Sequence, residues 1–164
     1  MKVRPINNSE PDKNILIDLY DLYADYFDLK EGQKEYYEDE YTTELNTIVQ
    51  KISQNDLSDS IYFLENVSSE HPVGMSMVCD TGSGTCEIKR VIISESARGK
   101  KYGAFFMNEV LEHAKKLGYQ KATLDVLKTK SEAALHLYQS LGFSIYKTES
   151  FLSENDVVFL EKTL

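Results

Sequence analysis

With 164 residues, the chain is long enough to bury a sizeable core, and residues 1–164 are predicted to form a single domain. The net charge of −9 argues against general nucleic-acid binding, because phosphate backbones attract a surplus of Lys and Arg. Apolar residues make up 41%, and no run approaches the roughly 20 apolar residues of a membrane span. The first residues lack an apolar signal core, so a soluble cytoplasmic protein is expected.

The charge is unevenly distributed along the chain. Residues 9–44 carry 12 acidic residues and 3 lysines, a net charge of −9. Residues 87–130 carry 10 basic and 5 acidic residues, a net charge of +5. The acidic front of the chain therefore suits a cationic partner, and the basic middle suits an anionic one.

The front of the chain is predicted to contain one strand and two helices. A short strand over 2–6 precedes an amphipathic helix over 10–28. The apolar stripe expected on this helix consists of Ile15, Leu19, Leu22 and Tyr26. Residues 31–44 form a polar, acidic and tyrosine-rich stretch, and a second helix is predicted over 44–53.

Three predicted strands follow: 61–67, 72–80 and 85–94. The last two are joined by the turn sequence Gly-Ser-Gly, which is typical of a β-hairpin. If Gly82 and Ser83 form the turn centre, Cys79 and Cys86 lie directly opposite each other. Reduced thiols are nevertheless expected, because the compartment predicted for this chain disfavours disulfides.

The back of the chain alternates helices and strands: an apolar helical stripe from 106 to 117, a strand over 121–127, a helix over 129–142, and strands over 143–150 and 155–163. Gly118 and Gly142 are suited to end the two helices. Thr129, with Glu132 three residues later, has the pattern of a capping box at the start of the second. The whole order, β-α-α-β-β-β-α-β-α-β-β, predicts a mixed α/β domain.

The segment ARGKKYGA, residues 97–104, joins a predicted strand to the start of a helix. The first N–H groups of a helix have no partner within the helix, and the helix dipole places partial positive charge there. Gly99 and Gly103 would let a ligand approach the backbone, and the cations of the segment are Arg98, Lys100 and Lys101. Taken alone, the segment fits a diphosphate site and a simple connection between strand and helix equally well.

Together with SEAALHLYQSLGF, residues 131–143, this segment resembles the GNAT superfamily of N-acyltransferases. That family carries Gln/Arg-x-x-Gly-x-Gly/Ala for the pyrophosphate of acyl-coenzyme A, and often Asn-x-x-Ala-x-x-Leu-Tyr-x-x-x-Gly-Phe downstream. Arg98 and Gly103 match the first motif, whereas Lys101 stands at its central glycine. Ser131 stands at the asparagine of the second motif, whose other positions are matched by Ala134, Leu137, Tyr138, Gly142 and Phe143.

The resemblance implies a mixed, mostly antiparallel sheet of about seven strands with four helices. It also implies acetyl-coenzyme A as co-substrate, a primary amine as acceptor and no metal. The cofactor-binding residues that it implies are Val91, Ile92, Ile93, Arg98, Gly99, Lys100, Lys101, Tyr102, Gly103, Ala104, Ser131, Ala134 and Tyr138.

Two of the implied roles are catalytic. Tyr138 matches the tyrosine that commonly protonates the leaving thiolate in this family, and a core tyrosine on the helix stripe is the alternative. The thioester strand would supply an oxyanion-stabilising amide from Val91 or Ile93.

The general base is less clearly marked than the acid. Glu87 is the first candidate, because period-two alternation places it on the strand face of Lys89, Val91 and Ile93. Its alternative is a solvated carboxylate at a strand end, and Glu65 and Asp80 are weaker candidates. The three histidines form neither a nucleophile-histidine-acid pattern nor a metal-ligand spacing.

The acceptor region implied by the family covers residues 23–41. Its aromatic residues, interleaved with acids, are Tyr23, Tyr26, Phe27, Tyr36, Tyr37 and Tyr41. Aromatic faces and carboxylates together hold ammonium groups. A cationic acceptor such as a polyamine, an aminoglycoside-like drug or a lysine-bearing peptide is the hypothesis, and a solvated acidic helix face is the alternative.

Two functions stay open on the sequence alone. The first is an acetyl-coenzyme A-dependent N-acetyltransferase. The alternative is a non-catalytic acyl-coenzyme A sensor of the same fold, which the departures at Lys101 and Ser131 keep open. An acidic protein-interaction module would leave the paired motifs unexplained. A homodimer is also open, because the final strands could pair between subunits.

Overall fold

The structure is a computed structural model of the 164-residue chain. It describes residues 1–26, 34–54, 60–128, 131–151 and 155–164. For 34–42, 151 and 155 it describes the backbone only.

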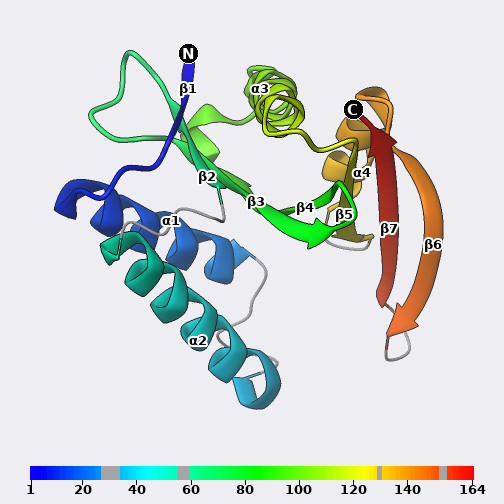
Figure 1. Ribbon diagram of the computed structural model, residues 1–164, viewed down its shortest axis with the longest axis horizontal. Coiled ribbons are helices and arrows are strands. Elements are labelled where there is room, and N and C mark those ends of the chain that lie inside the picture. Colours follow the sequence, from blue (N-terminus) through cyan, green and yellow to red (C-terminus); the bar gives the residue numbers. More distant parts are fainter. Residues whose placement is uncertain (27–33, 55–59, 129–130, 152–154) are drawn as a thin grey trace. The chain divides into compact units, whose positions relative to one another are not determined.

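The described part of the chain contains the predicted elements in the predicted order (Figure 1). The strands are β1 Lys2–Pro5, β2 Ser60–Glu65, β3 Gly74–Gly82, β4 Thr85–Ile93, β5 Lys121–Leu127, β6 Ser144–Phe151 and β7 Asn155–Thr163. The helices are α1 Glu10–Tyr26, α2 Lys34–Ser53, α3 Tyr102–Lys116 and α4 Glu132–Ser140, with a short 3-10 helix at Glu95–Ala97.

The strands form one seven-stranded sheet in the order β1-β2-β3-β4-β5-β7-β6. β1 pairs antiparallel with β2, and β7 pairs antiparallel with both β5 and β6. β4 and β5 are parallel, and α3 lies between them in the chain, as a crossover connection requires. The mixed, mostly antiparallel α/β fold is therefore confirmed.

The chain divides into two compact units. The first comprises Met1–Met77 and Arg90–Ala97, and the second comprises Val78–Lys89 and Arg98–Leu164. β3 and β4 thus each contribute residues to both units, and β4 changes unit between Lys89 and Arg90.

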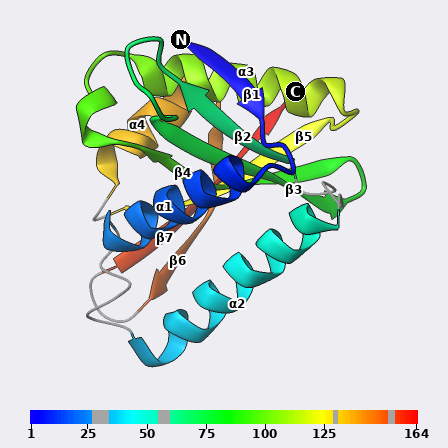
Figure 2. The same ribbon diagram turned by 90° about the vertical axis from the view of Figure 1, so that its left-hand side faces the viewer.

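In the first unit, helices α1 and α2 lie side by side (Figures 1 and 2). The predicted α1 stripe is displaced: Tyr26 is 41% exposed, whereas the buried residues are Asp12, Leu16, Leu19, Tyr20 and Ala24. The reason is tertiary, because an ion pair described below draws the first turn inward at Asp12. Apolar periodicity could not include a buried carboxylate in the stripe.

Helix α2 begins ten residues earlier than predicted, at Lys34 rather than residue 44. The polar stretch before residue 44 contains no Gly or Pro after Gly32, and Glu and Lys are good helix formers. The stretch has no aliphatic residue between Lys34 and Glu44, and this hid the helix from a search based on periodicity.

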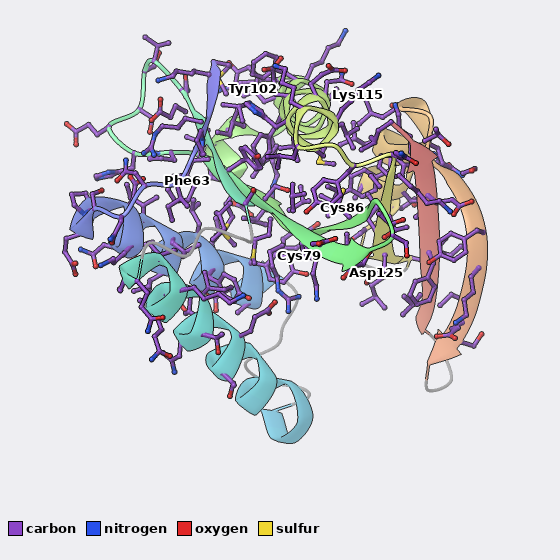
Figure 3. All side chains as sticks on the ribbon, in the orientation of Figure 1. Phe63, Cys79, Cys86, Tyr102, Lys115 and Asp125 are labelled. Atoms are coloured by element: carbon purple, nitrogen blue, oxygen red, sulfur yellow. The ribbon has the colours of Figure 1, made fainter. Side chains whose placement is uncertain are left out.

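A buried ion pair fixes the start of α1. Arg4 donates to Asp12 through two hydrogen bonds, of 2.6 Å from Nη1 and 2.8 Å from Nη2, and its Nε donates to Glu65. The Asn7 amide donates to Asp12 Oδ2 at 2.9 Å, and the Arg4 guanidinium lies 5.2 Å from the centre of the Phe63 ring (Figure 3 labels Phe63). These contacts hold β1, β2 and the first turn of α1 together.

We expect Asp12→Asn to destabilise the fold in a pH-dependent way. Burial alone would raise the pKa of Asp12, but the Arg4 and Asn7 hydrogen bonds hold it below its usual value. A depressed folded pKa stabilises the fold above the unfolded pKa of about 3.9, and this stabilisation is lost as the pH falls through the folded value. Urea unfolding should show a loss of about 2 kcal/mol at pH 7 that shrinks below pH 4. A loss equal at both pH values would contradict this, and Glu10→Gln, at an exposed carboxylate, is the control.

In the second unit, the periodic predictions hold with one exception. The predicted α3 stripe is buried at Phe106, Met107, Val110, Leu111 and Ala114, but its last member, Leu117, is 57% exposed because the helix ends at Lys116. On β5, Ala122, Leu124 and Val126 are buried and alternate with more exposed residues. The β5 and β7 bounds equal the predicted ones.

The hairpin turn lies one residue later than the Gly82–Ser83 turn that would place the two cysteines opposite each other. β3 runs to Gly82 and β4 begins at Thr85, so Ser83 and Gly84 form the turn, and both have positive φ. The condition that placed Cys79 opposite Cys86 is therefore not met; Figure 3 labels both residues. Neither Cys79 nor Cys86 forms a disulfide, which agrees with the expected reduced thiols, and burial raises the pKa of Cys86 to about 11.

Candidate active site

The segment Arg98–Ala104 forms an exposed turn that leads into α3. Arg98, Gly99, Lys100 and Lys101 are all exposed, and Tyr102 opens the helix (Figure 3 labels Tyr102 and, further along α3, Lys115). Gly99 has φ 74°, and a Cβ placed there would have open space around it. The α3 N-terminus carries no side-chain cap, so its amide groups are not satisfied in that way. The turn thus combines a helix N-terminus with three cations, as an anion site requires.

Lys101 stands where the family motif has its central glycine. A residue within the first turn of a helix would need no positive φ. Lys101 is instead the N-cap of α3, with φ 61° and ψ 13°, a left-handed conformation. Glycine adopts this conformation without cost, whereas a residue with a Cβ loses about 1–2 kcal/mol. The glycine of the family motif is thus explained by backbone geometry, and Lys101 is strained.

We expect Lys101→Gly to raise the free energy of unfolding by roughly 0.5–1 kcal/mol, because relief of left-handed strain exceeds the extra entropy of an unfolded glycine. Lys101→Ala is the matched variant, since it removes the same charge but keeps the Cβ. Its stability should stay near that of the wild type in denaturant unfolding. Equal stabilities for the two variants would show that backbone strain at this position is not significant.

Tyr138 belongs to a structural motif that ends α4. Gly142 has φ 89° and donates its N–H to the Gln139 carbonyl, and Phe143 donates its N–H to the Tyr138 carbonyl, both at 3.0 Å. This pair of bonds is a Schellman motif, which favours a contact between the two residues that flank it. The rings of Tyr138 and Phe143 accordingly meet edge to face, with centroids 5.9 Å apart. The Tyr-x-x-x-Gly-Phe pattern therefore builds one local unit, in which Phe143 packs against the Tyr138 ring.

Tyr138 is 6% exposed. A buried ring agrees with the core-tyrosine interpretation, and it also agrees with a general acid whose ring is fixed by Phe143. Burial alone does not choose between the two, so the catalytic role of Tyr138 stays a prediction.

The start of α4 differs from the predicted capping box. The helix begins at Glu132 with Ser131 as its N-cap, rather than with Thr129, which lies outside the described residues. Ser131 is buried, at 7% exposure, and its side chain makes no capping hydrogen bond. Ala134 is half-buried one turn into the helix. Ser131 therefore occupies the motif's asparagine position as the N-cap of α4, with its carbonyl accepting the Leu135 N–H but its side chain not capping the helix.

Glu87 lies on β4 within the second unit. It is directly opposite Thr123 in the parallel ladder with β5, which runs from Thr85–Lys121 to Glu87–Thr123. Its Oε2 lies 3.7 Å from Lys89 Nζ, and both side chains are about one-third exposed, at 32% and 31%. Glu87 is thus partly exposed and lies near a cation. Both properties also fit a solvated carboxylate at a strand end.

The segment Val91–Ile93 of β4, which was predicted to run beside the thioester, lies in the first unit. Ile92 is buried, and Val91 and Ile93 are half-buried. Arg90 has φ 52°, outside the β region, so the alternation used to place Glu87 and Val91 on one face does not extend through it. The common face of these residues therefore stays a prediction.

The predicted site residues fall into the two units as follows. Val91, Ile92 and Ile93 belong to the first, and Glu87, Arg98–Ala104, Ser131, Ala134 and Tyr138 belong to the second. Within the second unit, the sequence interpretation missed the contact between Tyr138 and Phe143, although the glycine before Phe143 signalled the helix end that creates it.

Comparison with known proteins assigns the family. Residues 16–143 match the Acetyltransferase (GNAT) family. The chain belongs to the GNAT family. The GNAT assignment confirms the resemblance drawn from the two motifs, both of which lie within the matched residues.

Two curated relatives bear N-acetyltransferase names. An uncharacterized N-acetyltransferase of Schizosaccharomyces pombe is 38% identical over 73 residues, which are 44% of this chain and 40% of that protein. One from Dictyostelium discoideum is 34% identical over 80 residues, 48% of this chain and 37% of that protein. The matched segments thus span about two-fifths of each relative.

Solved structures show the same fold across the whole chain. A ribosomal-protein-alanine N-acetyltransferase from Brucella melitensis has a TM-score of 0.72 at 17% identity and covers 100% of both chains. A Bacillus subtilis acetyltransferase in complex with CoA has 0.66 at 21%, over 99% of this chain and 98% of that one. A spermidine N-acetyltransferase chimera that includes the Vibrio cholerae enzyme has 0.70 at 18%, over 99% and 96%. At such identities the likeness concerns the GNAT fold alone.

In the part of the chain that the structure describes, no three His, Cys, Asp or Glu side chains are grouped so that they could hold a metal ion. None of the helices in the same part of the chain is long and apolar enough to cross a membrane.

Proposed function

We propose that this chain transfers an acetyl group from acetyl-coenzyme A to a primary amine. The observation that carries the proposal is the turn Arg98–Lys101, where a left-handed residue and three cations stand at the uncapped N-terminus of α3 in a chain of the GNAT family. Such a terminus suits a diphosphate, and coenzyme A is the diphosphate that acetyltransferases use. The likeness to a structure holding CoA supports this choice.

The proposed cofactor residues divide the ligand between them. Amides of Gly99–Ala104 and the cations Arg98, Lys100 and Lys101 would bind the pyrophosphate. The backbone of Val91–Ile93 would pair with the pantetheine arm as an added strand does. Ser131 and Ala134 would line the path at the start of α4, next to Tyr138.

The proposed reaction is a direct attack. The neutral amine nitrogen forms a bond to the thioester carbonyl carbon, and an amide of Val91 or Ile93 stabilises the resulting oxyanion. The carbon–sulfur bond then breaks, and the Tyr138 hydroxyl gives its proton to the departing thiolate. The proton lost from the amine passes to Glu87, directly or through water. The products are an amide and free coenzyme A.

The acceptor is proposed to be a cationic amine, on the strength of the acidic front of the chain. The aromatic residues of this region that the structure describes differ in their surroundings. Tyr23 already lies against an internal cation, with its ring centre 5.3 Å from the Arg90 guanidinium, whereas Tyr26 is 41% exposed. Phe27, Tyr36, Tyr37 and Tyr41 lie outside the described side chains. The likeness to a spermidine acetyltransferase chimera agrees with a polyamine but at 18% identity does not select it.

A thiol-release assay with acetyl-coenzyme A and a panel of amines tests the proposal. Release that depends on an amine supports acetyl transfer, and a preference for polyamines and basic peptides supports the cationic acceptor. A preference for neutral or anionic amines would overturn the acceptor class alone. Tight binding of acetyl-coenzyme A without release on any amine would favour the non-catalytic sensor, and absence of binding would exclude both functions.

A further inference from the structure

Arg90 has a backbone conformation that a strand arginine does not adopt freely. It lies within β4, yet its φ is 52°. Residues with a Cβ are uncommon in the left-handed region, and the conformation persists only where surrounding contacts hold it. Contacts with other residues must therefore hold Arg90 in this conformation.

Three side chains of the first unit hold the Arg90 guanidinium, and we call Tyr20, Tyr23 and Glu44 the Arg90 clamp. Nε and Nη2 of Arg90 both donate to Glu44 Oε2, the Nε bond measuring 3.0 Å. Nε also donates to the Tyr20 hydroxyl at 3.2 Å, and that hydroxyl donates to Glu44 Oε2 at 2.5 Å. The guanidinium carbon lies 5.9 Å from the Tyr20 ring centre and 5.3 Å from that of Tyr23. One strand arginine is thus gripped by residues of both α1 and α2.

The clamp is buried and balanced in charge. Tyr20 is fully buried, and the Arg90 and Glu44 side chains are 21% and 23% exposed. Burial alone would lower the pKa of Arg90, but Tyr23, Tyr20 and Glu44 raise it above its ordinary value. Burial also raises the pKa of Tyr20 above its ordinary value. The guanidinium and the Tyr20 hydroxyl therefore both keep their protons at neutral pH.

The backbone of β4 after Arg90 is also restricted by the neighbouring strand β3. A Cβ added to Gly74 on β3 would lie 2.7 Å from the Ile92 carbonyl oxygen, so glycine permits a close approach of the two backbones. Ile92 itself is 4% exposed. The segment Val91–Ile93 therefore begins directly after a left-handed residue, and its backbone lies close to that of β3.

We propose that Arg90 is a positioning residue, whose side chain, held by the clamp, fixes the left-handed turn of β4 and thereby the direction of the Val91–Ile93 amides. This role rests on the proposed function, in which those amides bind the acyl arm of the cofactor. Arg90 does not touch the reacting atoms in this account. The clamp also explains why Tyr23 is not available as a cage for a substrate ammonium.

Two substitutions at position 90 separate the backbone from the side chain. Arg90→Ala loses the clamp and keeps a Cβ, so the left-handed conformation becomes unfavourable. Arg90→Gly also loses the clamp but tolerates positive φ. We expect Arg90→Ala to lower kcat/KM for acetyl-coenzyme A by about 10-fold or more, because small displacements of binding groups have large kinetic effects. Arg90→Gly should recover most of that loss.

The same variants have a readout that does not require activity. Amide hydrogen exchange and backbone chemical shifts of Val91, Ile92 and Ile93 should change in Arg90→Ala and return toward wild-type values in Arg90→Gly. If Arg90→Ala does not fold, Glu44→Gln, which keeps the size of the side chain, takes its place. It should change the amide exchange and chemical shifts of the same residues by an intermediate amount. Lys2→Ala removes a cation of the same unit whose side chain is 70% exposed, and it should behave as the wild type.

The outcomes decide the proposal separately from the function. Wild-type exchange and kinetics in Arg90→Ala would overturn it, and so would equal defects in the alanine and glycine variants. If the wild type transferred acetyl to no amine, the proposed function would fail, and the exchange comparison at residues 91–93 would still decide whether Arg90 positions them.

Discussion

Tyr138→Phe is expected to lower kcat by about 100-fold or more while leaving the Kd for acetyl-coenzyme A within a few-fold of the wild type. The substitution removes only the hydroxyl, and general-acid catalysis contributes about 100- to 10,000-fold. The phenyl ring keeps the edge-to-face contact with Phe143, so the end of α4 should stay in place. Steady-state kinetics and isothermal titration with acetyl-coenzyme A measure the two quantities.

Tyr146→Phe is the matched control for this prediction. Tyr146 is 52% exposed on β6, and its loss of a hydroxyl should leave kcat unchanged. An unchanged kcat in Tyr138→Phe would assign Tyr138 to the core of the second unit rather than to catalysis. A fall in kcat that is explained by a loss of thermal stability would also assign Tyr138 to the core.

Glu44→Ala is expected to lower the free energy of unfolding by about 3 kcal/mol. It leaves the Arg90 guanidinium largely buried without its carboxylate, and breaking a buried pair in this way costs about 3–5 kcal/mol. The low end of that range applies because both side chains are about one-fifth exposed. Urea unfolding at neutral pH measures the loss.

The double variant Glu44→Ala, Arg90→Met tests the cause of that loss. Methionine removes the unpaired charge and fills space beside the Tyr20 and Tyr23 rings, so part of the stability should return. A single-variant loss below about 0.5 kcal/mol, typical of exposed pairs, would show that the pair is effectively solvated. Losses that simply add in the double variant would show that Glu44 and Arg90 are not coupled.

Elements governed by local pattern were predicted well from the sequence. The bounds of β5 agree with the prediction because this strand alternates apolar and polar residues, and those of β7 agree because a run of apolar residues, Val157–Leu160, lies at its centre. The ends of α3 and α4 agree because Gly118 and Gly142 both adopt the positive φ that ends a helix. Periodicity and glycine placement were sufficient for these parts of the second unit.

Features that depend on distant contacts could not be predicted in the same way. The buried face of α1 includes Asp12 only because Arg4 reaches it from β1. The Arg90 clamp had one visible signal, an arginine directly before the apolar residues Val91–Ile93 of a predicted strand, which implies a carboxylate partner. With 27 acidic residues in the chain, the sequence could not select Glu44.

The candidate site was predicted at the level of motifs. Arg98–Ala104 lies at the start of α3 and Tyr138 lies in α4, as the motif spacing implied. The sequence interpretation missed the left-handed conformation of Lys101, because it compared residue types rather than backbone angles. The roles of Tyr138, Glu87 and the cofactor-binding residues stay predictions until they are measured.

Mass spectrometry of an amine incubated with the protein and acetyl-coenzyme A tests the central claim most directly. The account predicts one acetyl group on the amine nitrogen for each coenzyme A released, with both products falling about 100-fold or more in rate in Tyr138→Phe. Bound acetyl-coenzyme A with no acetylated product from any amine of the panel would contradict it.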